Sequence, residues 1–157
     1  MRLFLDKIAP EAWADAERFS AAVKRTTAES GLRDQEAELI KVRASQLNGC
    51  VFCLDLHARQ ARQAGVTQQQ LDVLAAWRDA PIYSERERAA LAVAEAATVL
   101  PLTEDSRADL FAAHAVLGEQ DFVAAEWVAA AINLFNRVSI LSEHPIQARD
   151  AAGKVVR

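Results

Sequence analysis

The pattern of apolar and polar positions along the chain is that of helices. Runs of Val, Ile and Thr at alternating spacing, which are typical of strands, are missing. Alanine is abundant, and only five glycines and four prolines interrupt the 157 residues, a composition that also favours helices. The chain therefore predicts an all-α, single-domain helical bundle over residues 1–157, with about six to seven helices.

Residues that start and stop helices mark the expected boundaries. Pro10 stands at the favoured first position of a helix, and Gly65 suits a left-handed C-terminal turn. Thr67 and Ser84 each begin a capping-box pattern, with Gln or Glu three residues later. The predicted helical segments are 10–31, 32–48, 50–64, one that begins at 67, 84–100, 103–118 and 119–141.

The segment 119–141 carries information about assembly because apolar residues cover most of its circumference. A helix of this kind is buried. It either runs through the core of one protomer or is covered by a second subunit, and the pattern leaves both possibilities open. The apolar residues are Phe122, Trp127, Val128, Ile132, Leu134, Phe135, Val138 and Leu141.

Charge and hydropathy exclude several classes of function. The net charge is −4 and no cluster of Lys and Arg occurs, so nucleic acid is not an expected partner. The chain begins with an apolar run of only three residues, Leu3 to Leu5, which is too short for a secretory segment. No stretch is apolar enough to cross a membrane. We therefore expect a cytoplasmic protein with no membrane partner.

Both cysteines of the chain lie in the stretch NGCVFCLDLH, residues 48–57. In a reducing compartment, a C-x-x-C pair indicates redox chemistry or a metal site rather than a structural disulfide. If a helix begins near Cys50, then Cys50, Cys53 and His57 fall within an arc of roughly 60°. The helix N-terminus is expected to lower the cysteine pKa. His57, one turn after Cys53, could accept and return a proton.

Three further candidates are weaker. Glu38 lies beside the apolar pair Leu39 and Ile40, and it could act as a general base or orient His57. A half-buried carboxylate tends to have a raised pKa, which suits proton transfer. From the spacing alone, a surface pair with Lys41 is the favoured interpretation. His114 and His144 are isolated, and each is interpreted as a packed or surface histidine. A structural zinc usually takes four ligands, so the single cysteine pair favours redox chemistry over metal, and no metal ligand is assigned.

Glu38, the stretch SQLNGCVFCLDLH from Ser45 and the closing ARQAG together resemble the AhpD-like alkylhydroperoxidase branch of the carboxymuconolactone decarboxylase superfamily. The later stretches SERERAALAVAEA from Ser84 and INLFNRVSI from Ile132 are similar to it as well. The resemblance covers about residues 30–141 as the core of the domain. It implies an all-α fold and a homo-oligomer, as a dimer, trimer or hexamer.

The resemblance also implies a thiol-dependent peroxidase with peroxiredoxin-type antioxidant activity, or a disulfide reductase. Cys53 would attack the hydroperoxide, Cys50 would resolve the sulfenic acid to a disulfide, and Glu38 and His57 would relay protons. No cofactor is bound. Reducing equivalents come from a dithiol redox partner, which carries a lipoyl group in one branch of the family. Some relatives carry an extra histidine beside the pair, where Val51 and Phe52 stand here.

Two other functions remain open on the sequence. The first is a non-redox helical protein in which Cys50, Cys53 and His57 hold a metal or a small ligand. The second is a carboxymuconolactone decarboxylase-like enzyme, whose activity would survive replacement of both cysteines. The polar residues Asn133, Asn136 and Arg137 also match a pattern of the family, and we interpret them as groups that satisfy one another in a buried environment.

Overall fold

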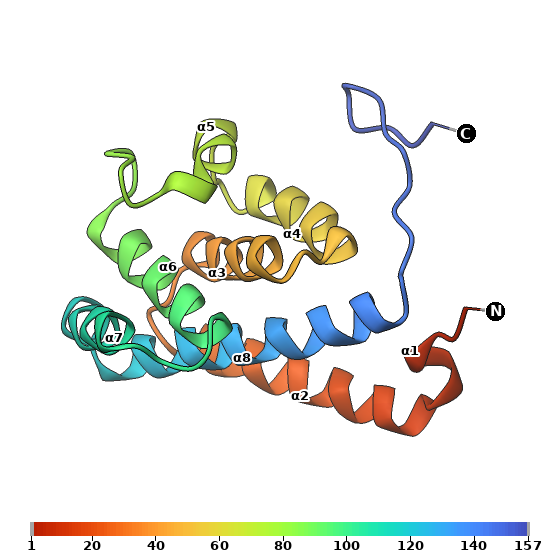
Figure 1. The fold of residues 1–157 in the computed structure, drawn as a ribbon, viewed down its shortest axis with the longest axis horizontal. Helices are drawn as coiled ribbons and strands as arrows, with labels where there is room; N and C mark the ends of the chain where they lie inside the picture. Colours follow the sequence, from red (N-terminus) through yellow and green to blue (C-terminus); the bar gives the residue numbers. More distant parts are fainter. Residues whose placement is uncertain (1, 157) are drawn as a thin grey trace.

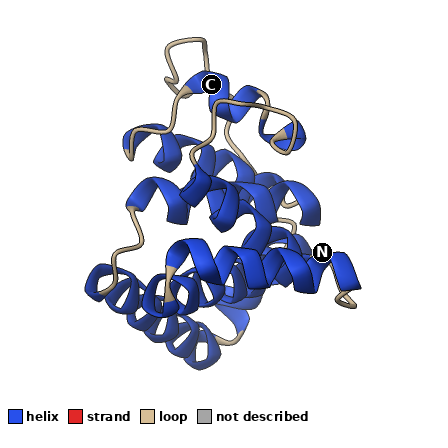
Figure 2. Cartoon of the chain, turned by 90° about the vertical axis from the view of Figure 1, so that its left-hand side faces the viewer, coloured by secondary structure: helices blue, strands red, loops and turns tan. Residues whose placement is uncertain are grey.

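Helices joined by loops make up the part of the chain that the computed structural model describes, residues 2–156 (Figure 2). This confirms the predicted all-α fold, and no strand occurs in that range. In chain order the elements are α1 (Leu5–Ile8), α2 (Pro10–Glu29), α3 (Asp34–Asn48), α4 (Val51–Gln63), α5 (Gln68–Asp72), the 3-10 turn η1 (Leu74–Ala76), α6 (Glu85–Thr98), α7 (Glu104–Leu117) and α8 (Glu119–Leu141).

Most boundaries agree with the predicted segments to within about two residues. The capping boxes at Thr67 and Ser84 are formed as expected, and the Ser84 hydroxyl accepts the N–H of Glu87. Two features were not predicted. The short helix α1 precedes Pro10, and the segment from Thr67 breaks into α5 and η1, which turns Leu74 into the core.

Helix α3 lies at the centre of the bundle, in contact with α4, α6 and α8 (Figure 1). Its apolar residues are buried against two clusters, one shared with α2, α6, α7 and α8 and one shared with α4 to α6. A third, small cluster joins α3, α4 and α8 around the cysteines. The buried residues of α3 are Glu36, Ala37, Leu39, Ile40, Val42, Ala44 and Ser45.

A buried carboxylate ties α3 to α6 and α8. Glu36 accepts two hydrogen bonds from Arg86, at 2.8 and 3.0 Å, and Arg86 also reaches Asp121 at 2.9 Å. The hydrogen bond to Glu36, together with Asp121, outweighs burial and raises the pKa of the Arg86 guanidinium. The sequence gives little indication that Glu36 is buried, because a charged residue in a helical pattern is ordinarily solvated.

The two ends of the described chain lie on the same side of the molecule, where α1 packs against the end of α8 (Figure 1). The backbone N–H of Leu5 donates to the Ser142 hydroxyl at 3.0 Å. Glu143 adopts a left-handed φ of 48° just after α8, and the N–H of His144 then bonds the carbonyl of Ser139 at 3.1 Å. This helix end turns His144 back over the last turn of α8.

Helix α8 is only partly covered in one protomer. Val128 and Ile132 are buried, whereas Trp127, Leu134 and Leu141 are exposed. The prediction that this helix lies buried nearly all round is therefore confirmed on one face of α8 only. Across residues 2–156, no helix combines the length and the apolar character that a membrane crossing requires.

Candidate functional site

The cysteines are placed by a sharp link between α3 and α4. Gly49 ends α3 with a φ of 68°, a conformation that glycine adopts without steric cost. The N–H of Cys50 bonds the carbonyl of Ser45 at 3.0 Å, and α4 begins at the next residue. Cys50 is therefore the N-cap of α4, and its sulfur accepts the N–H of Cys53 at 3.4 Å.

Both cysteines are free thiols and both are almost fully buried, with 2% of Cys50 and 3% of Cys53 exposed. They pack with Ala44 of α3 and Ile132 of α8. The two cysteines lie close together, and the Cys53 thiol lies 3.9 Å from the carbonyl oxygen of Phe135. The spacing prediction that Cys50 and Cys53 share one face of a helix turn agrees with this geometry.

The expected low cysteine pKa is not found at Cys50. Burial and the neighbouring Cys53 thiol raise the pKa of the Cys50 thiol to about 12, although it stands at a helix N-terminus. Desolvation disfavours the thiolate more than the helix dipole stabilises it. At neutral pH, Cys50 is therefore a neutral thiol that needs a base before it can react as a nucleophile.

Glu38 and His57 meet across the α3–α4 interface. Nδ1 of His57 lies 3.1 Å from Oε2 of Glu38, and Lys41 donates to Oε1 of the same carboxylate at 2.6 Å. The proposed base and the proposed surface pair therefore both exist. A carboxylate only accepts, so Nδ1 of His57 carries the hydrogen and Nε2 of the neutral ring remains an acceptor.

The charge state of Glu38 differs from the expectation that a half-buried carboxylate has a raised pKa. Burial raises the pKa of Glu38, but the hydrogen bond from His57 and the charge and hydrogen bond of Lys41 outweigh it, so the pKa is lowered. The carboxylate is thus ionised at neutral pH. Within residues 2–156, no hydrogen bond joins His57 to either sulfur, although His57 follows Cys53 by one helical turn.

The face of α4 that packs inward is also shifted from the predicted one. The helical spacing of Val51, Leu54, Ala58 and Ala61 predicts that this stripe faces the core, with the cysteines beside it and half shielded. Val51 is instead 56% exposed, while Cys53 and Ala61 are buried. The cysteine face is the buried face, because α8 covers it.

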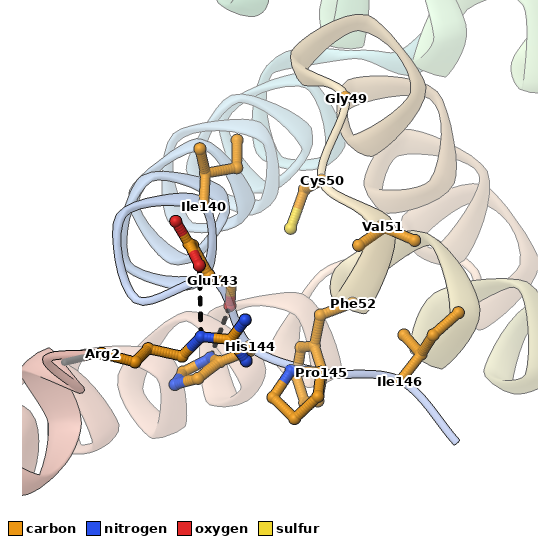
Figure 3. Close-up of a pocket in the computed structure, with 11 residues that line it drawn as sticks. Arg2, Gly49, Cys50, Val51, Phe52, Ile140, Glu143, His144, Pro145 and Ile146 are labelled. Carbon is orange, nitrogen blue, oxygen red and sulfur yellow. Dashed lines mark hydrogen bonds and ion pairs between the residues drawn. The ribbon is translucent and has the colours of Figure 1, made fainter. Parts of the chain in front are cut away.

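A pocket of about 390 Å³ opens beside Cys50 and is shown in Figure 3. Phe52 and the two apolar residues that follow α8, Pro145 and Ile146, form part of its wall. Arg2 and Glu143 pair across its rim at 3.1 Å. The sulfur of Cys50 points into this pocket in Figure 3. The lining residues are Arg2, Gly49, Cys50, Val51, Phe52, Ser139, Ile140, Glu143, His144, Pro145 and Ile146.

His144 is the site residue that the sequence did not indicate. It is a packed histidine, as interpreted, but it lies in this pocket with its ring centroid 5.3 Å from that of Phe52. Its Nδ1 is 3.2 Å from the Ser139 hydroxyl and its Nε2 is 3.1 Å from Oδ1 of Asp6. His114, the other isolated histidine, lies exposed on α7 against Phe122.

Amide side chains hold the α3–α4 link against α8. Asn48 donates to Asn133 at 2.8 Å and to Asn136 at 2.9 Å, and Asn136 donates to the Ser45 hydroxyl at 3.1 Å. Arg137 donates to the oxygen of Asn48 at 2.7 Å. The three residues of α8 thus bond to Asn48 and not to one another, and only Asn136 is buried while Arg137 is exposed, which corrects the interpretation in part. Through Asn48 they hold the link that carries Cys50. Among residues 2–156, no three His, Cys, Asp or Glu side chains gather to form a metal site.

Comparison with known proteins agrees with this geometry. The model of the carboxymuconolactone decarboxylase family matches residues 10–96, more than half of the chain. The chain belongs to the carboxymuconolactone decarboxylase family. The matched part includes α3 and α4, and with them Glu38, both cysteines and His57.

Similar proteins include the uncharacterized protein YdfG of Bacillus subtilis (strain 168), which is 34% identical over 134 residues, 85% of this chain and 88% of YdfG. The uncharacterized protein YnjA of Escherichia coli (strain K12) is 37% identical over 67 residues, 43% of this chain and 37% of YnjA.

A solved structure extends the comparison to the fold. It is the crystal structure of a protein of unknown function from Agrobacterium tumefaciens, described as a candidate AhpD antioxidant defence protein. The match has a TM-score of 0.80 and 30% identity, and it covers 93% of this chain and 99% of that one. The resemblance to the AhpD-like branch of the carboxymuconolactone decarboxylase superfamily is thereby confirmed.

Proposed function

We propose that this protein is a thiol-dependent alkylhydroperoxidase or disulfide reductase of the AhpD-like type. The observation that carries the proposal is the pair of free thiols at the first turn of α4, with an ionised carboxylate on α3 paired with His57 of α4. Adjacent thiols of this kind can close to a disulfide without unwinding the helix. The C-x-x-C pair also favours redox chemistry over a lactone decarboxylase.

The proposed reaction oxidises the dithiol by two electrons. The Cys53 thiolate attacks the terminal oxygen of a hydroperoxide, the O–O bond breaks, and the alkoxide leaves as an alcohol after taking up a proton. Cys53 becomes a sulfenic acid. The Cys50 thiolate then attacks the Cys53 sulfur, the S–O bond breaks, and water is released as the disulfide forms.

Glu38 and His57 are the proposed proton relay for Cys53. Because Glu38 fixes the hydrogen of His57 on Nδ1, Nε2 is free to accept the Cys53 proton, through water where the distance requires it. The ionised carboxylate stabilises the imidazolium that results. The same ring then supplies the proton that the leaving alkoxide takes up.

Reduction of the disulfide requires an external dithiol, and we propose a redox protein partner such as a lipoyl-bearing protein. The Cys50 sulfur faces the pocket, so it is the sulfur that an incoming thiolate would attack. A dithiol cycle of this kind operates in a reducing compartment, which supports a cytoplasmic location.

We also propose that the protein works as a homo-oligomer. Trp127, Leu134 and Leu141 expose a row of large apolar side chains along α8, and exposed apolar surface of this kind marks interaction sites. Light scattering coupled to gel filtration measures the assembly directly. A monomer at micromolar concentration would contradict this part of the proposal.

The first experiment is a thiol count on anaerobically purified protein, before and after one equivalent of cumene hydroperoxide, with the metal content of the same sample. The proposal predicts that two free thiols fall to none, and that Cys53→Ser abolishes this loss. Trapping of a sulfenic acid in Cys50→Ser would identify Cys53 as the attacking thiol.

Three results would contradict the proposal. Thiols that do not react with peroxide but carry stoichiometric zinc would indicate a metal-binding protein instead. Lactone decarboxylation that survives replacement of both cysteines would indicate the decarboxylase-like alternative. A sulfenic acid that forms only in Cys53→Ser would reverse the roles of the two thiols.

A further inference from the structure

A chain of polar side chains leads from the Cys50 sulfur to the opposite end of the sequence. Cys50 and Ser139 line the same pocket, and the Ser139 hydroxyl lowers the pKa of the Cys50 thiol. Ser139 bonds Nδ1 of His144 at 3.2 Å, and Nε2 of His144 bonds Asp6 at 3.1 Å. The proposed peroxide cycle uses none of Ser139, His144 and Asp6.

The direction of these bonds follows from what each group can donate. The Asp6 carboxylate only accepts, so Nε2 of His144 carries the ring hydrogen and Nδ1 accepts from the Ser139 hydroxyl. The Ser139 oxygen is then free to accept from the Cys50 thiol. A base, His144, is thus connected to Cys50 through one hydroxyl group.

His144 is held firmly in this position. Its side chain is 13% exposed, its ring stacks on Phe4 at a centroid distance of 5.6 Å, and it meets the edge of Phe52 from the other side. Its backbone N–H is bonded to the carbonyl of Ser139. A histidine fixed by two ring bonds, two aromatic neighbours and a helix end is preorganised for one role.

We propose that Asp6, His144 and Ser139 form a second proton relay, which serves Cys50 when it resolves the sulfenic acid and when its disulfide is reduced. The proposal deepens the proposed peroxidase function and rests on it for its biological purpose. Ser139 lies beside Cys50 in the lining of the pocket, His144 is the base, and Asp6 is a positioning residue. Since Cys50 is otherwise held neutral by burial, a dedicated base gives it a route to the thiolate.

The proton balance closes within the site. The Cys50 proton passes to the Ser139 oxygen while the Ser139 hydrogen passes to Nδ1 of His144, which leaves a thiolate and an imidazolium beside the Asp6 carboxylate. The thiolate attacks the Cys53 sulfenic acid. The S–O bond breaks, and the departing hydroxide takes up one proton to leave as water, so the two thiols and the hydroperoxide yield disulfide, alcohol and water.

The groups that face Cys50 set the sign of its response to pH. Burial raises the pKa of the Cys50 thiol most, and the Cys53 side chain on α4 raises it further, whereas the Cys53 backbone N–H and the Ser139 hydroxyl on α8 lower it. The charged groups around the pocket are Arg2 and Glu143, which neutralise each other in an exposed pair, and Asp6, which faces His144 and not the sulfur. Loss of the Ser139 hydroxyl is therefore expected to raise the pKa of Cys50 further.

The test measures the rate of alkylation of each cysteine by iodoacetamide from pH 7 to pH 10, by peptide mass mapping of the reduced protein. In Ser139→Ala and Asp6→Asn we expect the Cys50 rate at pH 8 to fall at least about tenfold, since one pKa unit changes the thiolate fraction tenfold. The whole rate profile of Cys50 between pH 7 and pH 10 shifts to higher pH in Ser139→Ala. The Cys53 rate stays within about twofold of the wild type.

Controls separate the relay from a disturbed pocket. His114→Asn changes an exposed histidine on α7 outside the pocket lining and should leave the Cys50 rate unchanged. Asp6→Glu keeps a carboxylate and should restore most of it. Unchanged Cys50 rates in both Ser139→Ala and Asp6→Asn, with wild-type circular dichroism and melting temperature, would overturn the proposal. Alkylation needs no peroxide, so failure of the relay and failure of the peroxidase function give different results.

Discussion

The two sides of the cysteine pair are built from the same parts in different ways. On one side His57 meets Glu38 at 3.1 Å, with 14% and 12% of their side chains exposed. On the other His144 meets Asp6 at 3.1 Å, with 13% and 21% exposed. The first pair joins adjacent helices and spans 19 positions, whereas the second joins the two ends of the chain and spans 138. Similar chemistry thus arises from local packing and from the closure of the chain ends.

The two sides also treat charge differently. Lys41 and His57 keep the Glu38 carboxylate ionised despite its burial. Burial and a neighbouring thiol keep Cys50 neutral. The Glu38 side therefore carries a permanent negative charge at neutral pH, whereas on the His144 side Cys50 becomes charged only when it gives up its proton. This difference predicts that the Glu38 side supports the first step of the cycle and the His144 side the second.

The largest predicted effect is on the Glu38 side. Glu38→Gln or His57→Asn should lower the rate of peroxide-dependent sulfenic acid formation, measured in a Cys50→Ser background, by about 100-fold, because each removes general acid–base assistance to Cys53. Stopped-flow measurement with cumene hydroperoxide gives the rate. Lys41→Gln is the matched control, because it removes the neighbouring charge and keeps the histidine pair, and its effect should be about tenfold at most. A rate that Glu38→Gln and His57→Asn leave unchanged would exclude the pair from the first step.

A smaller effect tests whether the two sides act on different steps. His144→Asn should slow disulfide formation after the sulfenic acid by about tenfold and leave the first step unchanged. In the double variant with His57→Asn, each substitution should slow its own step as much as it does alone: His57→Asn sulfenic acid formation, and His144→Asn disulfide formation. Rapid-quench mass spectrometry separates the steps. A strong interaction between the two substitutions in the first step would mean that both histidines serve one sulfur.

The contrast between the sides also explains what could be predicted from the sequence. Cys50, Cys53 and His57 lie on one helix, so their spacing alone sets their relative positions. Glu38 lies on the preceding helix, so spacing alone could not place it beside His57, and it was the resemblance to a family pattern that predicted its role in the site. Asp6 and His144 meet only because α1 packs on the end of α8, and no local pattern encodes such a contact. The helices themselves were largely predictable, since caps and glycines act locally.

The cysteine environment was harder to predict for a second reason. The N-terminal position of Cys50 indicates a lowered pKa, but the cover provided by α8 decides the outcome, and that cover depends on tertiary packing. The same packing reversed the expectation for Val51, which is exposed while the cysteine face is buried. Local rules predicted the elements, and burial determined their chemistry.

The pH dependence of stability offers a test of the charged side. The folded-state pKa of Glu38 is below its ordinary value of 4.5, so the unfolded state binds more protons in acid. Glu38 therefore contributes stability that is complete above that value and is lost as pH falls through the lowered folded-state pKa. Urea unfolding of the wild type and Glu38→Gln from pH 7 to pH 3 should give curves that converge in acid. Curves separated by a constant amount over this range would contradict the assignment.

The smallest predicted effect concerns the helix end that positions His144. Glu143 has a left-handed φ of 48°. This conformation costs a residue with a side chain about 1–2 kcal/mol relative to glycine. Glycine in turn loses about 0.5–1 kcal/mol more conformational entropy on folding, which offsets part of its advantage. The ion pair with Arg2 is exposed on both partners and adds little. Glu143→Gly should therefore raise the free energy of unfolding by about 0.5–1 kcal/mol, measured by urea denaturation, whereas Glu143→Gln should not. A loss of stability in Glu143→Gly would mean that the side chain, and not the backbone turn, holds the pocket wall against Cys50.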